Sequence, residues 1–442
     1  MFCVRKMLLL LVAIFFASGS LMAQDWPQWR GSDGTNRSSE TGLFEKWGDD
    51  GPTLKWTAEG LGRGYATVSV ADGKIFTSGD IEAPEGEEAN WADIGAQQVV
   101  AYSLDGKQIW STRITDGTPK HPYKGSRTTP TYSDGKLFAV SSDGAISCLD
   151  AKTGKKQWSR KFKDWDGKMM STWGFSESPL VDDGKVICTP GGSKGIVVAL
   201  NVENGEEVWA CVLPDYGDEK GVNGKSLLDG AAYSSPVISN GGGVKQYVQM
   251  VGRGLLGVRA SDGGLLWRYK KVANGVANIP TSIIDGDYVF TSTAYNTGSA
   301  LLKLKASDDG VDAEEVYWLD GRKFQNKLGG MTLVDGHVYC GHGNGAGLPI
   351  CLELKTGEIK WGPLRTKGKG KGESSMIYAD GHFVWRRQDG FVSLVKANAE
   401  KLEVVRSFKP HFQEDNSWAQ PVIADGVLYL REQDKLMAYE LK

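Results

Sequence analysis

The feature that most constrains this chain of 442 residues is a repeated short polar turn followed by a tryptophan. One copy reads Cys-Leu-Asp-Ala-Lys-Thr-Gly-Lys-Lys-Gln-Trp over residues 148–158, and another reads Cys-Leu-Glu-Leu-Lys-Thr-Gly-Glu-Ile-Lys-Trp over 351–361. Looser copies end at Trp110, Trp209 and Trp267. A recurring segment of this kind builds one small unit several times, and each unit buries its apolar face against the next. The pattern therefore predicts a repeat architecture.

Each unit also contains an Asp-Gly or Asn-Gly pair between two short apolar segments. Such a pair supplies the positive φ that a two-residue hairpin turn requires. A third apolar segment and the segment that carries the Trp complete the unit, and four short antiparallel strands repeated around a circle form β-propeller blades. The pairs begin at Asp72, Asp134, Asp183, Asn240, Asp285, Asp335, Asp380 and Asp425.

The expected fold class is all-β, an eight-bladed β-propeller of four-stranded antiparallel blades in a single domain over residues 24–442. The eighth unit has three strands, and the unassigned segment 53–57 is expected to supply the fourth and close the ring. Closure in this way removes an exposed sheet edge. Units five and seven end irregularly, at Trp318 and at Phe408 in place of Trp, so a seven-bladed ring is the alternative.

The recurring tryptophans are expected to be structural. One Trp side chain buries on the order of 200 Å², which suits a residue that wedges neighbouring blades together. A residue needed for chemistry is seldom required at every repeat. We assign this docking role to Trp56, Trp110, Trp158, Trp209, Trp267 and Trp361.

The N-terminus predicts export. Arg5 and Lys6 precede an apolar run over 7–17, and small residues lead to Ala23, as in a secretory signal peptide spanning 1–23. We expect a periplasmic or cell-envelope protein with no transmembrane segment in the mature chain, and an uncleaved anchor is the alternative. The 51 basic and 54 acidic residues are nearly balanced, so no nucleic-acid partner is indicated.

The cysteines do not indicate a metal or haem site. Five follow residue 23, and the sequence contains neither a Cys-x-x-Cys-His nor a Cys-x-x-Cys motif. Their odd number does not imply a disulfide framework, although one bridge is conceivable. They are Cys148, Cys188, Cys211, Cys340 and Cys351.

A candidate site follows from aligning the units. The residues that lead into the first strand of each blade should meet at the mouth of the central channel. This ring could bind a small polar or anionic ligand, with Arg127 as the anchor for a carboxylate or phosphate. Alternatively, Arg127 pairs with Glu177 or Glu373 and fills the channel. The candidate ligand-binding residues are Tyr65, Arg127, Ser176, Glu177, Tyr233, Asn278, Glu373 and Trp418, with Leu328 at the equivalent place in blade six.

Three long inter-blade loops, over 115–126, 163–175 and 214–232, flank the same mouth. The middle loop carries Trp165, Met169, Met170 and Trp173. Exposed aromatic and Met side chains are typical of a partner surface, and loops carry function more often than scaffolds do. The alternative is that these residues only cap the tops of the blades.

The Ala-x-Asp-x-x-Thr-Gly-x-x-x-Trp pattern resembles the repeat of the quinoprotein (PQQ-type) propellers over essentially the whole mature length. The segment Asp-Trp-Pro-Gln-Trp-Arg-Gly over 25–31 is also similar to the start of exported PQQ-like propeller proteins. The resemblance implies one of two classes. One class comprises dehydrogenases that oxidise alcohols or sugars with a calcium-bound quinone on the axis. The other comprises non-enzymatic members, including the scaffold lipoprotein of the outer-membrane β-barrel assembly machinery.

The residues favour the non-enzymatic class. Many alcohol-oxidising quinoproteins carry two adjacent cysteines beside the quinone, and no two cysteines are adjacent here. Acidic clusters such as Asp164-Trp165-Asp166 lack the regular oxygen spacing of a calcium loop. We therefore expect an exported binding or scaffolding module that takes a small polar ligand or other envelope proteins, with no cofactor. The alternative is a PQQ-dependent alcohol or sugar dehydrogenase that uses PQQ and calcium.

Overall fold

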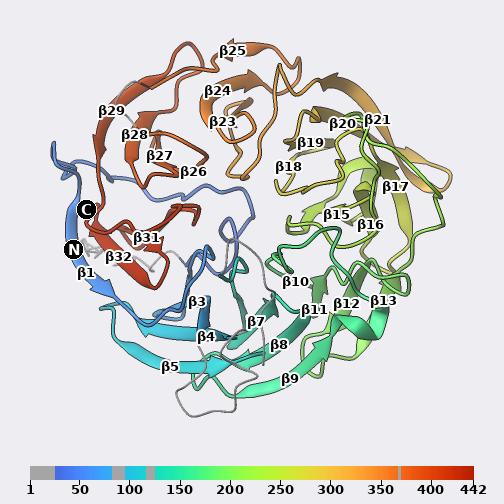
Figure 1. Cartoon of the computed structure of the whole chain (residues 1–442), viewed down its shortest axis with the longest axis horizontal. Coiled ribbons are helices and arrows are strands. Elements are labelled where there is room, and N and C mark those ends of the chain that lie inside the picture. The colour runs from blue at the N-terminus through green and yellow to red at the C-terminus, as the bar shows by residue number, and fades with distance from the viewer. Residues whose placement is uncertain (1–24, 82–94, 116–124, 367–369) are drawn as a thin grey trace, which may run out of the picture.

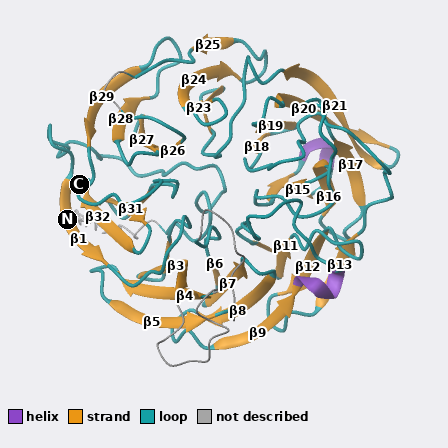
Figure 2. Ribbon diagram, in the orientation of Figure 1, coloured by secondary structure: helices purple, strands orange, loops and turns teal. Residues whose placement is uncertain are grey.

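The computed structural model describes residues 25–81, 95–115, 125–366 and 370–442, which form eight four-stranded sheets arranged around a central axis (Figure 1). The helical elements among these residues are two single turns of 3-10 helix, η1 (Phe162–Trp165) and η2 (Gly241–Gly243) (Figure 2). The eight-bladed propeller is confirmed, and the seven-bladed alternative is wrong. No helix in the described ranges is long and apolar enough to cross a membrane. The expected signal peptide lies outside them.

Each of the first seven blades uses four consecutive strands, with the first nearest the axis and the fourth at the rim (Figure 1). Blades one and two are β2 (Ser69–Ala71), β3 (Lys74–Ile81), β4 (Ala96–Ser103), β5 (Gln108–Arg113), β6 (Thr131–Ser133), β7 (Lys136–Ser141), β8 (Ala145–Asp150) and β9 (Lys156–Lys161). Blades three and four are β10 (Leu180–Asp182), β11 (Lys185–Cys188), β12 (Val197–Asn201), β13 (Glu207–Cys211), β14 (Val237–Ser239), β15 (Gln246–Val251), β16 (Gly254–Arg259) and β17 (Leu265–Tyr269).

Blades five to seven follow the same order, and blade eight takes its outer strand from the N-terminal region. Blades five to seven are β18 (Ile283–Asp285), β19 (Tyr288–Thr293), β20 (Gly298–Ser307), β21 (Gly310–Leu319), β22 (Thr332–Val334), β23 (His337–His342), β24 (Leu348–Glu353), β25 (Ile359–Trp361), β26 (Ser374–Ala379), β27 (His382–Arg387), β28 (Val392–Lys396) and β29 (Glu403–Phe408). Blade eight is β30 (Val422–Ala424), β31 (Val427–Glu432), β32 (Lys435–Glu440) and β1 (Thr53–Ala58).

The ring closes where β1 pairs antiparallel with β32, with Trp56 opposite Ala438, as the sequence predicts. Buried arginines also link the blades at this seam. Arg431 is 1% exposed and donates hydrogen bonds to the carbonyl of Ser78 in blade one and to that of Gly62, which lies between β1 and β2. Such a group costs much free energy if it is buried without partners, so satisfying it at the seam favours the closed ring.

The hairpin turns follow the Asp-Gly pairs, with two exceptions. Asp134 (φ 46°) and Gly135 (φ 78°) both have positive φ, as the primed hairpin turn requires. The Asn240 pair was expected to do the same, and this prediction is wrong. Asn240 has φ −110°, because the run of three glycines after it takes the chain through the short turn η2. In blade five Asp285 ends β18 and pairs with Tyr288, so the two turn residues are Gly286, at φ 58°, and Asp287.

The outer rim has a recurrent docking geometry. The indole of Trp110, on the fourth strand of blade one, donates to the carbonyl of Ala151 in blade two at 3.2 Å. Gly154 of the same blade-two turn lies against that indole, and a Cβ there would be 2.6 Å from the Trp110 ring. The repeated Gly therefore serves the preceding blade as well as its own turn. Trp56, Trp158, Trp209 and Trp361 likewise donate to the carbonyls of Leu104, Val202, Ala260 and Asn398.

Three blades depart from this geometry. Trp267 is buried but donates to Gln246 Oε1 of its own blade at 2.6 Å. In blade five, Tyr317 occupies the docking register opposite Leu301, and its hydroxyl donates to the carbonyl of Leu354 at 2.7 Å. The sequence suggested Trp318 for this place. The bulge after Leu301 fixes the register one residue earlier, so the expectation for Trp318 is corrected. In blade seven Arg406, and not Phe408, lies in the docking register opposite Leu394, and its Nη1 donates to the carbonyl of Trp47, on whose ring Phe408 packs edge to face.

Candidate functional site: the channel mouth

The channel is crossed by residues 25–38, which we call the axial plug, and its path is the blue segment that runs inward in Figure 1. At one end Trp26 forms a bridge with Val70 of β2. Farther along, the guanidinium of Arg30, 3% exposed, donates to the carbonyls of Thr281 and Met331 at 3.2 and 3.0 Å. These contacts tie the plug to blades on opposite sides of the ring.

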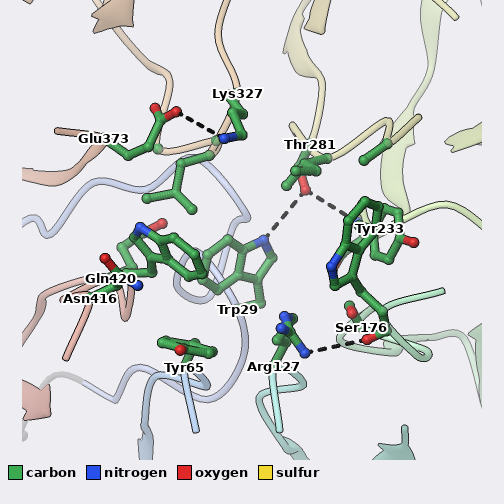
Figure 3. A pocket seen from close by; sticks show the side chains of 18 of the residues that line it. Trp29, Tyr65, Arg127, Ser176, Tyr233, Thr281, Lys327, Glu373, Asn416 and Gln420 are labelled. Atoms are coloured by element: carbon green, nitrogen blue, oxygen red, sulfur yellow. Dashed lines mark hydrogen bonds and ion pairs between the residues drawn. The ribbon is translucent and has the colours of Figure 1, made fainter. Parts of the chain in front are cut away.

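The plug forms the floor of a cavity of about 360 Å³ at the channel mouth (Figure 3). Trp29 lies at its centre, with Arg127 and Tyr65 on one side and Lys327 and Glu373 on the other. The volume lies within the range of small-molecule pockets, near its lower end. The aromatic residues of the lining are Trp29, Tyr65, Trp173, Tyr233, Tyr295 and Trp418, and its charged residues are Arg30, Arg127, Lys327 and Glu373.

Most of the predicted ring lines this cavity. The structure places Leu328 and six of the candidate residues there, namely Tyr65, Arg127, Ser176, Tyr233, Glu373 and Trp418.

Glu177 and Asn278 lie elsewhere. The Glu177 carboxylate accepts hydrogen bonds from the Thr189 amide at 2.5 Å and from Gln249 Nε2 at 3.1 Å. Successive side chains of an extended segment point to opposite sides, so Glu177 turns away from the cavity that Ser176 lines. Asn278 is fully buried, and its side chain bonds to the backbone of Asn274 and Val251, which orders the loop.

Arg127 is oriented by its neighbours on the wall. Its Nη1 donates to the carbonyls of Gly125 and Trp173 at 3.1 and 3.3 Å. The guanidinium carbon lies 5.3 Å from the centre of the Tyr65 ring, which in turn packs on Trp418 with centroids 4.9 Å apart. Burial lowers the pKa of Arg127. A guanidinium remains charged under such a shift, because its ordinary pKa exceeds 12.

Glu373 supplies the carboxylate of the cavity wall. It is 3% exposed and forms an ion pair with Lys327 across 3.5 Å. Burial raises the pKa of Glu373, and the charge of Lys327 opposes that shift. Both glutamates that were considered as partners of Arg127 thus make other contacts, and the axial plug fills the channel.

The loops beside the mouth were expected either to form a partner surface or to cap the blades, and their residues divide between the cavity wall and the blade caps. Trp165 and Met170 are buried, at 3% and 2% exposure, and cap the blades as the alternative predicts. Trp173 lines the cavity. In the loop over 214–232, Arg268 lies 3.7 Å above the centre of the Tyr216 ring. Residues 116–124 of the remaining loop lie outside the described residues.

Sequence reasoning missed the plug residues and the amides of the cavity. Trp29 and Arg30 precede the first blade and cannot be aligned with any repeat. Their partners lie about 250–300 positions away along the chain, so no local pattern indicates the contact. The amide and hydroxyl side chains that were missed are Ser178, Ser235, Thr281, Gln388, Asn416 and Gln420.

The donor set of the cavity does not fit a calcium-bound quinone. Calcium takes six to eight oxygen ligands in protein sites, usually several of them carboxylates. Among the described residues that line the cavity, Glu373 is the single carboxylate, and it is paired with Lys327. Within the described ranges, no three His, Cys, Asp or Glu side chains gather as a metal site. The five cysteines of those ranges are buried and form no disulfide with one another.

Comparison with known proteins gives two kinds of relative. The outer membrane protein assembly factor BamB of Burkholderia pseudomallei is 26% identical over 242 residues, which is 52% of this chain and 58% of that protein. The quinohemoprotein alcohol dehydrogenase ADH-IIG of Pseudomonas putida is 27% identical over 175 residues, which is 35% of this chain and 21% of the enzyme. This chain covers 26% to 60% of the length of the first three curated BamB proteins it matches.

The solved structures agree on the fold. BamB from Moraxella catarrhalis superposes with a TM-score of 0.58 at 12% identity, covering 88% of this chain and all of that one. The sequence profile of the family described as outer membrane protein assembly factor BamB matches residues 49–224 and 95–363. The PQQ-type repeats, the eight-bladed ring and this match together show that the chain belongs to the PQQ-like propeller family of the outer membrane protein assembly factor BamB.

Proposed function

We propose that this protein is a non-catalytic binding module of the cell envelope, and that its ligand or partner docks at the channel mouth. The observation that carries the proposal is the cavity above Trp29. It combines six aromatic side chains with cations and amides, and its single carboxylate is already paired with Lys327. Such a wall offers contacts for recognition, whereas a quinone dehydrogenase needs a metal ion beside its cofactor.

The wall is organised before any ligand arrives. Trp418 Nε1 donates to Gln388 Oε1 at 3.1 Å, and two backbone carbonyls hold Arg127. Trp29 belongs to a plug anchored on both sides of the ring. Side chains that are fixed beforehand lose little conformational entropy on binding, so more of the contact energy appears as affinity.

Two observations support a place in the envelope. The first is the signal-like N-terminus. The second is the family itself, whose curated members in Burkholderia and Yersinia carry the name outer membrane protein assembly factor. A partner in that setting would be another envelope protein, and the exposed loops around the mouth give it a surface to contact.

Site-specific photo-crosslinking in cells tests the proposal. A crosslinker replaces the exposed Thr172, which neighbours Trp173 of the cavity, and a matched one replaces Val405, 45% exposed on the outer strand β29. We expect capture of an envelope protein or envelope ligand from position 172 and not from position 405. Equal capture from both positions, or none from position 172, would contradict a functional mouth.

A second assay separates binding from catalysis. The purified protein is incubated with PQQ, calcium and a panel of alcohols and sugars, and reduction of an artificial dye is followed. We expect no turnover. Calcium-dependent dye reduction that is abolished in Arg127→Ala would replace the proposal with the quinoprotein dehydrogenase.

A further inference from the structure

One residue that lines the cavity has a buried hydrogen-bond acceptor without a donor among the described residues. Gln420 is 3% exposed and lines the cavity (Figure 3). Its Nε2 donates to Asn36 Oδ1 of the axial plug, which orients the amide. Its Oε1 has no hydrogen-bond partner among the described residues. A buried acceptor left unsatisfied costs about 1–3 kcal/mol, so a ligand that donates a hydrogen bond here would gain by supplying it.

Glu373 adds a second acceptor on the same wall. Its Oε1 contacts Lys327 only at the ion-pair distance of 3.5 Å and makes no hydrogen bond within the described residues. A carboxylate offers about four lone-pair sites, more than the contacts with Lys327 and the Gly345 backbone use. Gln420 and Glu373 therefore both favour a ligand with several O–H or N–H donors. A flat aromatic acid, which presents acceptors only, would leave them unsatisfied.

The two contacting aromatic pairs of the wall have no parallel faces. Tyr65 and Trp418 are inclined to each other by 43°, and Trp173 meets Tyr233 edge to face at 64°. Neither pair offers the parallel faces between which a planar ring would stack. Trp29 instead presents one platform at the base with polar side chains around it (Figure 3). A sugar ring fits this arrangement, because its C–H face packs on an indole while its hydroxyl groups point outward around the rim.

The charges of the wall disfavour a cationic ligand. Aromatic cages bind quaternary ammonium groups when their faces are free. Here Arg127 lies over Tyr65 at 5.3 Å, and Lys327 lies 5.9 Å from the centre of the Tyr295 ring. Among the described residues of the lining, three are cations and one is a carboxylate. This excess of positive charge favours an acidic ligand over a neutral one.

We infer that the channel mouth binds a saccharide that carries a carboxylate, such as a hexuronic acid unit. In this arrangement the sugar ring lies on Trp29, its carboxylate faces Arg127, and its hydroxyl groups donate to Gln420 and Glu373. The inference rests on the proposed function and specifies the class of ligand that the mouth recognises.

Saturation-transfer NMR on the purified mature protein tests the inference, with D-glucuronate, D-glucose and benzoate as probes. We expect transfer to glucuronate, weaker transfer to glucose and none to benzoate. Arg127→Gln should lower the affinity for glucuronate about tenfold and leave that for glucose unchanged, since one charge-assisted contact is lost. Trp29→Ala should abolish binding of both sugars.

Two further variants guard against loss of structure. Glu373→Ala leaves the plug intact and should weaken both sugars, whereas Trp361→Phe at the rim should change neither. Absence of sugar binding to the unmodified protein, or tighter binding of benzoate than of glucuronate, would overturn the inference. Equal affinities for glucuronate and glucose would overturn the carboxylate assignment. Capture from position 172 without sugar binding would leave the proposed function standing, whereas dehydrogenase turnover would overturn that function whatever sugar binds.

Discussion

The outer rim takes one residue from the fourth strand of each repeat, and the channel mouth takes one from the start of each repeat. The two regions differ in how far the residue type is repeated. At the rim, five tryptophans make the same hydrogen bond to the next blade. At the mouth, the eight equivalent positions hold seven residue types, from Leu328 to Arg127. A contact that every blade needs favours the same residue each time. Positions that do not take part in packing one blade on the next can hold different residues, and a binding site can form from them.

Removing the closing strand should give the largest effect. Deletion of residues 24–57 takes away β1 and the axial plug, which leaves β32 as an open edge and deletes the docking residue Trp56. We expect the protein to lose cooperative unfolding and to aggregate, as followed by circular dichroism and light scattering. Deleting residues 24–40 alone keeps β1 and should be milder. A soluble, cooperatively folded 24–57 deletion would show that closure does not hold the ring.

A pair of tryptophan substitutions tests the contrast directly. Trp209→Ala removes a rim indole that is 6% exposed, and should lower the free energy of unfolding by about 3–5 kcal/mol. Trp173→Ala, at the half-buried mouth, should cost less than half as much while weakening ligand binding. Urea unfolding and the crosslinking assay measure the two quantities. Similar losses of stability in both variants would contradict the prediction that the rim tryptophan contributes more to stability than the mouth tryptophan.

The pH dependence of stability should identify two buried carboxyls, of which Glu177 lies away from the cavity and Asp80 interacts with Arg127 of its wall. Burial raises the pKa of Glu177 from 4.5 to about 7 and that of Asp80 from 3.8 to about 6, the latter opposed by Arg127 and Arg431. The folded state therefore keeps protons that the unfolded chain releases. This stabilisation is complete below pH 4 and is lost as the pH rises through 6 and 7, by up to about 1.4 kcal/mol per unit for each group.

Glu177→Gln should flatten that slope, because an amide does not titrate. Urea unfolding at several pH values between about 5 and 8 would show a more stable variant at the upper end, relative to the parent. Glu203→Gln, at an exposed carboxylate, is the matched control and should leave the slope unchanged. An unaltered slope in Glu177→Gln would mean that this carboxyl is not the buried acid that the geometry indicates.

The smallest expected effect tests the corrected register of blade five. Tyr317→Phe removes only the hydroxyl that donates to Leu354, and should cost about 1 kcal/mol. Tyr288→Phe on β19 of the same blade serves as a control for loss of a tyrosine hydroxyl. If Tyr317→Phe is neutral in urea unfolding, the docking hydrogen bond at this position does not contribute to stability.

The sequence alone determined the architecture, because the local requirements repeat. A positive φ at Asp134 and Gly135 follows from residue type, and an indole at the same place on five of the eight outer strands follows from the need to pack each blade on the next. The orphan strand around Trp56 could be assigned because an unpaired edge must be covered. The mouth residues could be aligned because each repeat places one residue just before its first strand. Six of the eight candidates line the cavity.

Only the tertiary structure decided which side chains face the cavity and what closes it from below. Ser176 and Glu177 are adjacent in sequence, yet one lines the cavity and the other is buried away from it, since direction reverses at each residue of an extended chain. Trp29 and Arg30 occupy the axis through contacts with blades distant in sequence. A repeated pattern predicts the contacts between neighbouring blades. The contacts across the ring occur once and do not recur along the sequence, so the pattern cannot predict them.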